Sequence, residues 1–238
     1  MQKSASPFHS RVTLRAISSM ATRLLLTDIA GLYREEHGVN VQFESVGGVD
    51  AARRVRAGEA FEVVALASDA IDALIADGHV VADSKTDFVR SRVAVAVRTD
   101  APHPEIHDEH ALRDAVLAAR SIGYSTGPSG TSLMALFARW GIADAIAARI
   151  VQAPPGVPVG QLVADGTAEL GFQQLSELMN LPGVDVLATM PPACEIVTTF
   201  SAALCVAACN PPQASALLAF VRSPALDDLK RRHGLDAA

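Results

Sequence analysis

Short apolar runs alternate with segments of helical period along nearly the whole chain. Val12 to Ile17 predicts a strand, the apolar residues from Ala21 to Leu32 then recur at the spacing of one helix face, and Gly38 ends that helix. The same succession predicts further strands at residues 39–44, 63–66, 93–97, 121–124, 170–172 and 196–208, and further helices at residues 47–58, 70–76, 111–119, 132–140, 211–222 and 224–233. This alternation is typical of an α/β fold.

Two of the apolar runs lie between blocks of alternating strand and helix. Val93 to Val97 precedes one such block, and Ile196 to Ala208, which is long enough to cross between two bodies, follows it. We therefore expect two α/β lobes with a ligand cleft between them. Residues 1–91 and 200–238 are expected to form one lobe, and residues 92–199 the other.

Composition narrows the classes of partner. Hydrophobic residues make up 50% of the 238 residues and charged residues 19%, so the chain folds and is not disordered. Lys and Arg number 20 against 26 Asp and Glu, a net charge of −6, which offers no general attraction for nucleic acid or for an anionic membrane. Any anion must therefore be bound at a local site.

The sequence contains no clear motif for a metal site, a disulfide framework or a catalytic serine. Cys194, Cys205 and Cys209 include no CxxC pair, and His103, His107 and His110 lie among prolines and acidic residues typical of a surface loop. The serine-rich segments lack the Gly-x-Ser-x-Gly elbow of a hydrolase. We predict neither a metal site nor a cofactor.

The first residues bear on location. No apolar segment follows Met1 to Ser10, as a signal peptide would require, and no uninterrupted apolar run reaches membrane-spanning length. The sequence predicts a cytoplasmic protein without a membrane span, or a periplasmic one if a leader has been removed.

Three junctions between a strand and the following helix are rich in hydroxyl groups and glycine. They are Ile17 to Met20, Ser45 to Gly48 and Gly123 to Thr131. Helix N-termini collect unpaired N–H groups, and in an α/β sheet such junctions share the carboxyl edge where ligands bind. Ordinary helix capping and tight turns are the alternative. The candidate anion-binding residues are Ser18, Ser19, Gly47, Gly48, Ser125, Thr126, Ser129, Gly130 and Thr131.

The order of elements resembles the type II periplasmic solute-binding proteins, in particular their molybdate-binding branch. The resemblance covers essentially the whole chain and implies two lobes joined by crossovers near Arg92 and near Thr199, with the ligand held between them. The motifs that carry it are Arg15 to Ser19, Phe61 to Val64 with Ala67 to Asp69, Gly130 before its helix, Gly166 to Phe172, and Phe220 to Pro224.

Two departures from that branch concern the ligand. Molybdate-binding members place serines where this chain has Val46 to Val49, and a tyrosine where it has Gln174. Amide side chains both donate and accept, which suits an organic carboxylate. The segments Tyr124 to Gly130 and Gly171 to Glu177 are similar to the aconitate isomerase branch, which adds Gln173 and Gln174 to the candidate ligand-binding residues.

The resemblance implies isomerisation of a tricarboxylate between its cis and trans forms. Such a proton shift needs a base near carbon, and Tyr124 and Glu177 are the titratable side chains nearest the motifs. Arg23 or Arg92 could neutralise the ligand or be ordinary surface charges. The alternative function is a non-catalytic solute-binding protein for molybdate or another small oxyanion, and only that alternative requires a membrane transporter as partner.

Overall fold

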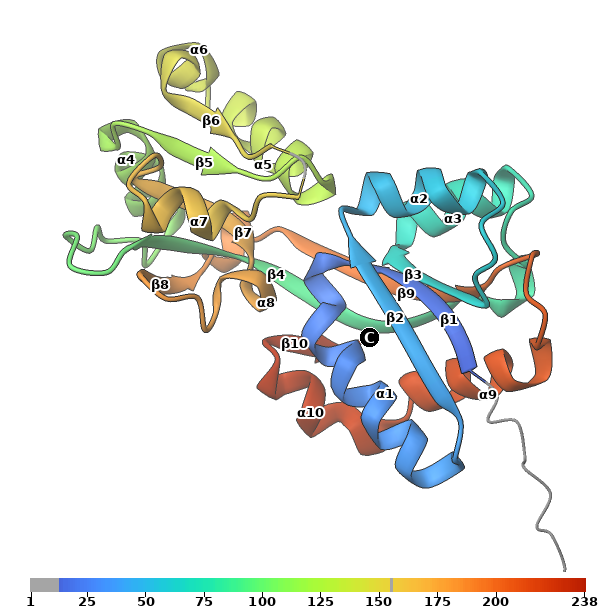
Figure 1. Cartoon of the computed structure of the whole chain (residues 1–238). Helices are drawn as coiled ribbons and strands as arrows, with labels where there is room; N and C mark the ends of the chain where they lie inside the picture. Colours follow the sequence, from blue (N-terminus) through green and yellow to red (C-terminus); the bar gives the residue numbers. More distant parts are fainter. Residues whose placement is uncertain (1–12, 155) are drawn as a thin grey trace, which may run out of the picture.

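In the computed structural model, which describes residues 13–154 and 156–238, strands and helices alternate as the pattern predicts (Figure 1). The chain is a mixed α/β protein, which confirms the predicted fold class. Val12, the expected start of the first strand, and Met1 to Ser10, on which the expectation about a leader rests, lie outside the described residues.

The first lobe is a mixed sheet with helices on both faces. Its strand β1 (Thr13–Ser19) is parallel to its neighbours β2 (Asn40–Val46) and β3 (Val63–Ala67), and the antiparallel β9 (Val197–Leu204) follows β3. The helices of this lobe are α1 (Arg23–His37), α2 (Gly48–Arg56), α3 (Ser68–Ala76), α9 (Pro211–Val221) and α10 (Asp227–Arg232).

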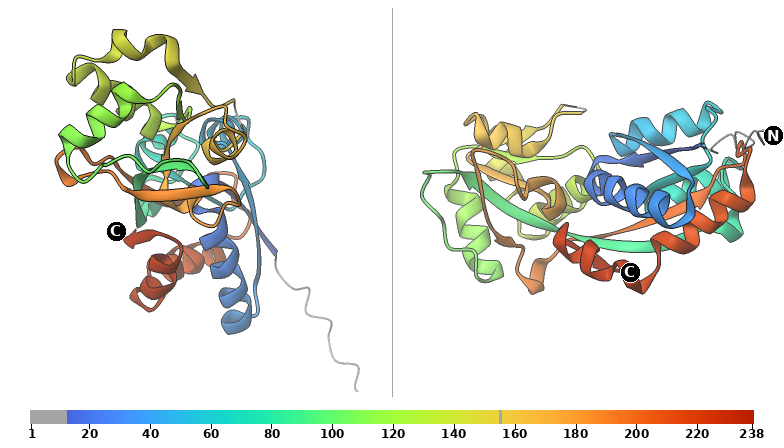
Figure 2. Two further views of the ribbon diagram at one scale, coloured as in Figure 1. Left: turned by 90° about the vertical axis from the view of Figure 1, so that its left-hand side faces the viewer. Right: turned by 60° about the horizontal axis from the view of Figure 1, so that its bottom comes forward.

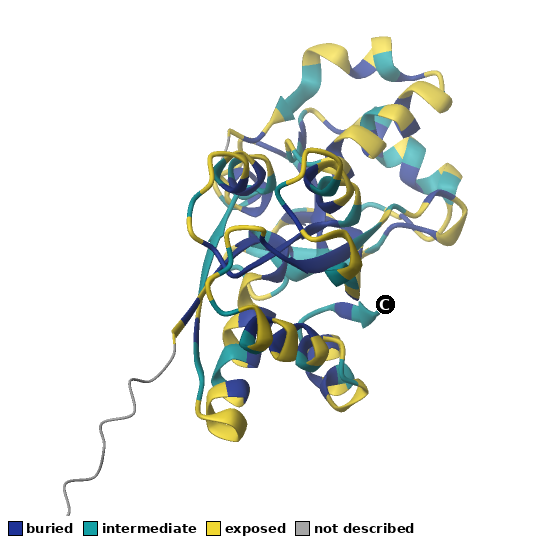
Figure 3. Cartoon of the chain, turned by 90° about the vertical axis from the view of Figure 1, so that its right-hand side faces the viewer, coloured by how far each residue is buried: buried dark blue, intermediate teal, exposed yellow. Residues whose placement is uncertain are grey.

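Alternate residues of these strands enter two separate apolar clusters. Leu14 packs with α1 and α9 on one face of the sheet, whereas Ile17 packs with α2 and α3 on the other. Figure 3 shows the resulting buried strands between helices whose outer faces are exposed. Because both faces are covered, the strands read as nearly continuous apolar runs.

The second lobe repeats this plan on a smaller scale. Its strands are β5 (Ile122–Tyr124), β6 (Ile150–Gln152), β7 (Leu170–Gln174) and β8 (Val184–Thr189), and its helices are α4 (Glu109–Ala118), α5 (Pro128–Arg139), α6 (Ala143–Ile146), α7 (Val159–Ala164) and α8 (Leu175–Leu178). Strand β5 is parallel to both β6 and β7. The carboxyl ends of these three strands therefore lie together.

One long strand, β4 (Thr86–Arg98), runs through both halves of the molecule (Figure 2). Its residues up to Arg92 pair with β9, and those from Val93 pair with β7 and β8. The sequence pattern predicted only its second half, because residues 86–92 contain just two apolar residues, Phe88 and Val89, among polar ones. The strand β10 (Leu235–Ala237) also pairs with the first half.

The expected long strand over residues 196–208 is shorter in the structure. β9 ends at Leu204, and Cys205 forms only an isolated bridge to Val80 before the chain turns. β9 pairs with β3 and with the first half of β4, so its ladder does not extend into the second lobe. The exact division of the chain into residues 1–91 with 200–238 and residues 92–199 stays a prediction.

A largely buried ion pair lies within α10. The Lys230 side chain is only 2% exposed, and its Nζ donates to Asp227 Oδ1 at 3.0 Å. We expect Asp227→Asn to lower the free energy of unfolding by about 1.5 kcal/mol, because the buried ammonium loses its countercharge. Thermal unfolding measures this loss. Asp228→Asn is the matched control, since the Asp228–Arg231 pair on the same helix is well exposed and should matter little. Equal effects of the two changes would contradict this role for Lys230.

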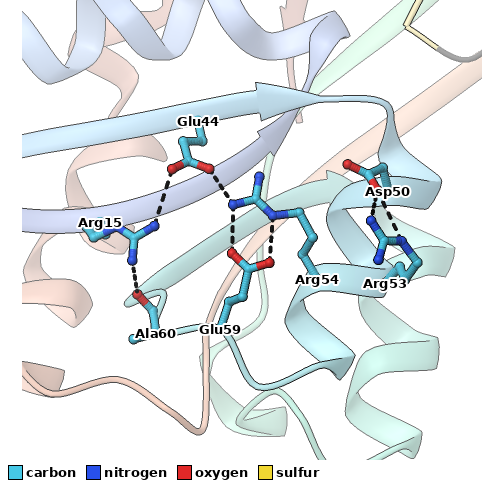
Figure 4. Close-up of polar contacts among 7 residues, drawn as sticks. All are labelled: Arg15, Glu44, Asp50, Arg53, Arg54, Glu59 and Ala60. Atoms are coloured by element: carbon cyan, nitrogen blue, oxygen red, sulfur yellow. Dashed lines mark hydrogen bonds and ion pairs between the residues drawn. The ribbon is translucent and has the colours of Figure 1, made fainter.

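Figure 4 shows a second ion-pair network, in which the guanidinium of Arg54 lies between two carboxylates. Arg54 Nη2 donates to Glu44 Oε2 at 2.6 Å and to Glu59 Oε2 at 2.7 Å, and Arg15 Nη2 donates to Glu44 Oε1 at 3.2 Å. The guanidinium carbons of Arg15 and Arg54 lie 5.0 and 5.2 Å from the ring centre of Phe61. The hydrogen bonds from Arg54 are the main reason that the pKa values of Glu44 and Glu59 are lowered.

This network predicts an acid-sensitive contribution to stability. Both carboxyls have lower pKa values in the folded chain than in the unfolded chain, so their stabilisation is present above about pH 4.3 and is lost as the pH falls through the folded pKa values. We expect Arg54→Met to flatten the dependence of the unfolding temperature on pH between about pH 3 and 5. An unchanged slope would show that these partly exposed pairs contribute nothing measurable.

Candidate functional site

The first two junctions lie side by side at the carboxyl edge of the first lobe. β1 and β2 are parallel with Ser18 opposite Ser45, and the two hydroxyl oxygens are 2.8 Å apart. Ser18 is therefore engaged by its neighbour. Ser19 is 8% exposed, and its Oγ has no hydrogen-bond partner in the described part of the chain.

Ser19 does not cap a helix with its side chain. A short 3-10 turn, η1 (Met20–Thr22), follows the strand, and α1 begins only at Arg23. The Ser19 backbone is extended and its side chain makes no capping hydrogen bond. The capping alternative therefore leaves its buried hydroxyl unexplained, whereas a ligand atom would satisfy it.

The second junction is open. Gly47 has φ −57° and ψ 138°, an extended conformation that any residue can adopt, so no tight turn demands glycine there. A side chain at Gly47 or Gly48 would meet no atom within 4 Å. The two glycines leave free space at the N-terminus of α2.

The third junction differs from the prediction. α5 begins at Pro128 rather than near Ser132, because Pro128 takes the first helical position after Gly127. Ser129, Gly130 and Thr131 thus lie in its first turn, and the last two N–H groups both donate to the Gly127 carbonyl, at 2.9 and 3.2 Å. Gly130 therefore does not precede its helix, and its N–H is not free for an anion.

Side chains of this third junction have varied surroundings. Ser129 is buried, with its Oγ 3.3 Å from that of Ser125, while Thr126 and Thr131 are exposed. Tyr124 is half-buried at the end of β5. A methyl group at Gly130 would overlap the Ser125 carbonyl oxygen and lie 3.0 Å from Tyr124 Cδ2. The glycine lets the loop fold tightly back over the helix.

A fourth junction, from β7 into α8, concentrates the polar groups of the second lobe. Gln173 and Gln174 end the strand at 4% exposure each. Gln173 Nε2 donates to Glu177 Oε1 at 2.9 Å, and Gln174 Nε2 donates to Thr198 Oγ1 at 2.8 Å. Gln174 Oε1 and Ser176 Oγ are buried and, within the described residues, unpartnered.

The two lobes meet at this fourth junction. Helix α8, which follows Gln174 on the second lobe, contacts η1, the turn that directly follows Ser19 on the first. Three buried polar atoms without partners in the described residues lie on or beside these contacting elements: Ser19 Oγ at the end of β1, Gln174 Oε1 at the end of β7 and Ser176 Oγ in α8. A fourth such atom, Ser91 Oγ, lies in β4. Buried polar groups are ordinarily paired, so these atoms are candidate partners for a polar ligand.

Glu177 is the titratable group of this contact. The residue is partly exposed, but surrounding protein displaces water from its carboxyl and raises its pKa to about 7. The hydrogen bond from Gln173 and the charge of Arg23, at the start of α1, act in the opposite direction on this pKa. A carboxyl that titrates near neutral pH can both accept and return a proton.

Other candidate residues lie apart from this contact. Arg92 is near carboxylates of its own, 3.7 Å from Glu195 and 3.4 Å from Asp236, so a ligand is not needed to balance its charge. Ser176 and Thr198 were missed by sequence reasoning. The four-residue helix α8 is too short to produce a periodic signal, and Thr198 falls within an apolar strand.

The open surface pockets lie elsewhere, in the first lobe. One, of about 430 Å³, is lined by Lys85, Thr86, Asp87, Arg222 and Ala238. Another, of about 450 Å³, is lined by Leu32, Glu35, Glu36, Phe220, Ala225 and Leu226. Neither includes a junction residue.

Neither a metal-binding cluster nor a membrane-spanning helix occurs in residues 13–154 and 156–238. No group of three His, Cys, Asp or Glu side chains in this part of the chain is placed to hold a metal ion. No helix in the same range combines the length and the apolar character needed to cross a bilayer.

Known proteins resemble this chain in sequence and in fold. The family described as bacterial extracellular solute-binding protein matches residues 14–236. An aconitate isomerase from a Pseudomonas species is 35% identical over 217 residues, covering 89% of this chain and 82% of that protein. The periplasmic molybdate-binding protein of Azotobacter vinelandii superposes with a TM-score of 0.77 at 19% identity, over 93% of this chain and 98% of that one. The sulfate-binding protein SubI of Mycobacterium tuberculosis superposes with a TM-score of 0.77 at 15% identity, over 94% of this chain and 86% of that one.

Proposed function

The chain belongs to the bacterial extracellular solute-binding protein family, and we propose that it binds a small polycarboxylate between its two lobes and isomerises it. Membership confirms the resemblance to two-lobed periplasmic binding proteins and to their molybdate-binding-like branch. The proposed reaction is the interconversion of cis- and trans-aconitate, which agrees with the 35% identity to an aconitate isomerase.

The observation that carries the proposal is the position of Glu177. Its carboxyl has a pKa of about 7 and lies on the helix that contacts η1 of the other lobe. In the proposed reaction the ionised carboxylate removes a proton from the methylene carbon of aconitate. The electron pair spreads over the adjoining carbon–carbon double bond and its carboxylate, and the protonated Glu177 returns the proton one allylic position away. The double bond shifts, and no net proton is consumed.

The surrounding groups suit an oxygen-rich substrate. The hydroxyls of Ser19 and Ser176 can donate to substrate carboxylates, and the free amide oxygen of Gln174 can accept from a carboxylic acid or hydroxyl group. The positive charge of Arg23 acts on the Glu177 carboxyl at a distance and can help to balance the charge that develops during proton removal. We keep Ser18, Gly47, Gly48, Ser125 and Ser129 as proposed binding residues, and Tyr124 as a proposed second catalytic group.

Turnover in D₂O tests the proposal. Purified protein is mixed with trans-aconitate without added metal, and proton NMR follows the appearance of cis-aconitate and the exchange of the methylene protons. We expect both, because a proton held on Glu177 between removal and return can exchange with solvent. Measurable binding of aconitate without isomerisation or exchange would make the protein a receptor rather than an isomerase.

The second candidate function is a non-catalytic binding protein for a small oxyanion. Its support is the fold shared with molybdate- and sulfate-binding proteins. Calorimetry in phosphate-free buffer with molybdate, sulfate, citrate and both aconitates separates the two candidates. Tight binding of molybdate with no response to a tricarboxylate would favour this function, and with it a transporter partner. The family description as extracellular also favours the exported alternative over a cytoplasmic location.

A further inference from the structure

The side chain of Gln173 is fixed at both ends by the protein. Its Oε1 accepts from the backbone N–H of Gly160 at 3.3 Å, and its Nε2 donates to Glu177 Oε1 at 2.9 Å. The residue is 4% exposed. Because a backbone N–H can only donate, the amide oxygen must face Gly160 and the amide NH₂ must face Glu177.

The neighbouring amide of Gln174 has no such fixed orientation. Its partner is the Thr198 hydroxyl, which can donate or accept, so either end of that amide could face it. The two adjacent glutamines thus differ in kind: Gln173 is locked within the protein, and Gln174 retains a buried polar atom without a partner. Both the amide oxygen and the amide nitrogen of Gln173 are thus engaged by the protein.

We infer that Gln173 is a positioning residue, which holds the Glu177 carboxylate in place from its own strand and ties that carboxylate to α7. This inference rests on the proposed role of Glu177 as the base. The hydrogen bond from Gln173 is the only one that reaches the Glu177 carboxylate from residues 13–154 and 156–238. It leaves the other oxygen, Oε2, to act on the substrate.

Few charged groups act on the Glu177 carboxyl besides its hydrogen bond from Gln173. The elements packed against α8 are η1, α7, β4, β7 and β8. Among the charged groups on these elements and on the adjoining α1, Arg23 is the one that acts on the Glu177 carboxyl. Loss of the Gln173 donor should therefore shift the titration of Glu177 upward, since the remaining influences are burial and the distant charge of Arg23.

Gln173→Met tests the inference, because methionine keeps the length of the side chain and removes both polar groups. Carbon-13 NMR of glutamate-labelled protein, with the Glu177 signal assigned from the spectrum of Glu177→Gln, gives the midpoint of its titration. We expect the midpoint to rise by about one pH unit, and kcat at neutral pH to fall with little change in KM. Gln174→Met is the matched control, and its Glu177 midpoint should equal that of the unaltered protein.

If loss of the Gly160 contact unfolds Gln173→Met, Gln173→Glu is the variant for the same titration. The new carboxyl can still accept from Gly160, but it places a second acid beside Glu177. The two acids should titrate together, with one midpoint well above that of the unaltered Glu177.

The outcomes separate this inference from the proposed function. An unchanged Glu177 midpoint in Gln173→Met, or in the folded Gln173→Glu if that variant is needed, overturns the positioning role whether or not aconitate is isomerised. A shifted midpoint in a protein that never turns over aconitate upholds the coupling between Gln173 and Glu177 and refutes the isomerase instead.

Discussion

Replacing Glu177 by glutamine is expected to lower kcat for aconitate isomerisation at least a hundredfold, because a general base contributes about 10²–10⁴-fold to such a reaction. The glutamine keeps the shape of the side chain and can accept the hydrogen bond that Gln173 Nε2 gives at 2.9 Å. It cannot take a proton from carbon. Proton NMR measures the turnover, and calorimetry with trans-aconitate should show that binding is retained.

Glu169→Gln is the matched control for this prediction. Glu169 also belongs to the second lobe, but it accepts hydrogen bonds from Arg120 and lies away from α8. Its replacement should leave turnover unchanged. If Glu177→Gln keeps activity within a factor of two of the unaltered protein, Glu177 is not the base, and Tyr124 becomes the next residue to replace.

The raised pKa of Glu177 also fixes the pH dependence of activity and of stability, in opposite directions. Activity should rise as the pH increases through about 7, because the ionised form removes the proton.

The free energy of unfolding should fall as the pH rises from about 4.3 to 7, because Glu177 ionises at a lower pH in the unfolded chain than in the folded chain. Glu177→Gln removes this cost, so the variant should unfold at a higher temperature than the unaltered protein at pH 8. A residue that costs stability in its ionised form is better explained by function than by folding.

The sequence predicted the fold because its signals are local and repeated. The parallel strands of the first lobe read as apolar runs, since helices cover both faces of the sheet, and Gly38, Gly58 and Gly78 follow their helices with positive φ. The hydroxyl-rich junction after β1 was likewise visible. It drew attention to Ser19, whose buried hydroxyl the structure leaves without a partner in its described residues.

The parts that sequence reasoning missed depend on distant contacts. Residues 86–92 form a strand because β9 and β10 supply hydrogen bonds to them, and their mostly polar sequence resembles a surface segment. Glu177 was a candidate only through its place in a motif. Its raised pKa comes from burial, its hydrogen bond comes from four residues earlier in the chain, and its opposite charge, Arg23, comes from the other lobe. Only the folded chain joins these three influences.

Gly130→Ala is expected to destabilise the protein by about 3 kcal/mol and to weaken aconitate binding at least tenfold. The added methyl group would overlap the Ser125 carbonyl oxygen, a backbone atom that cannot rotate away, and would press on Tyr124. Overpacking of this kind ordinarily costs about 1–3 kcal/mol, and here it exceeds the roughly 1 kcal/mol that alanine gains over glycine within a helix. Thermal unfolding and calorimetry measure the two effects.

Gly127→Ala separates this steric effect from the mere loss of a glycine. Gly127 stands three residues earlier in the same junction, with φ −81° and no atom within 4 Å of an added side chain. We expect it to lose less than about 1 kcal/mol, through the weaker N-cap that alanine makes. If the two variants lose stability equally, the close approach at Gly130 is not what shapes this loop. If Gly130→Ala loses stability but binds aconitate as tightly as before, the loop from Ser125 to Ser129 lies outside the ligand site, and binding must depend on the contact between η1 and α8 alone.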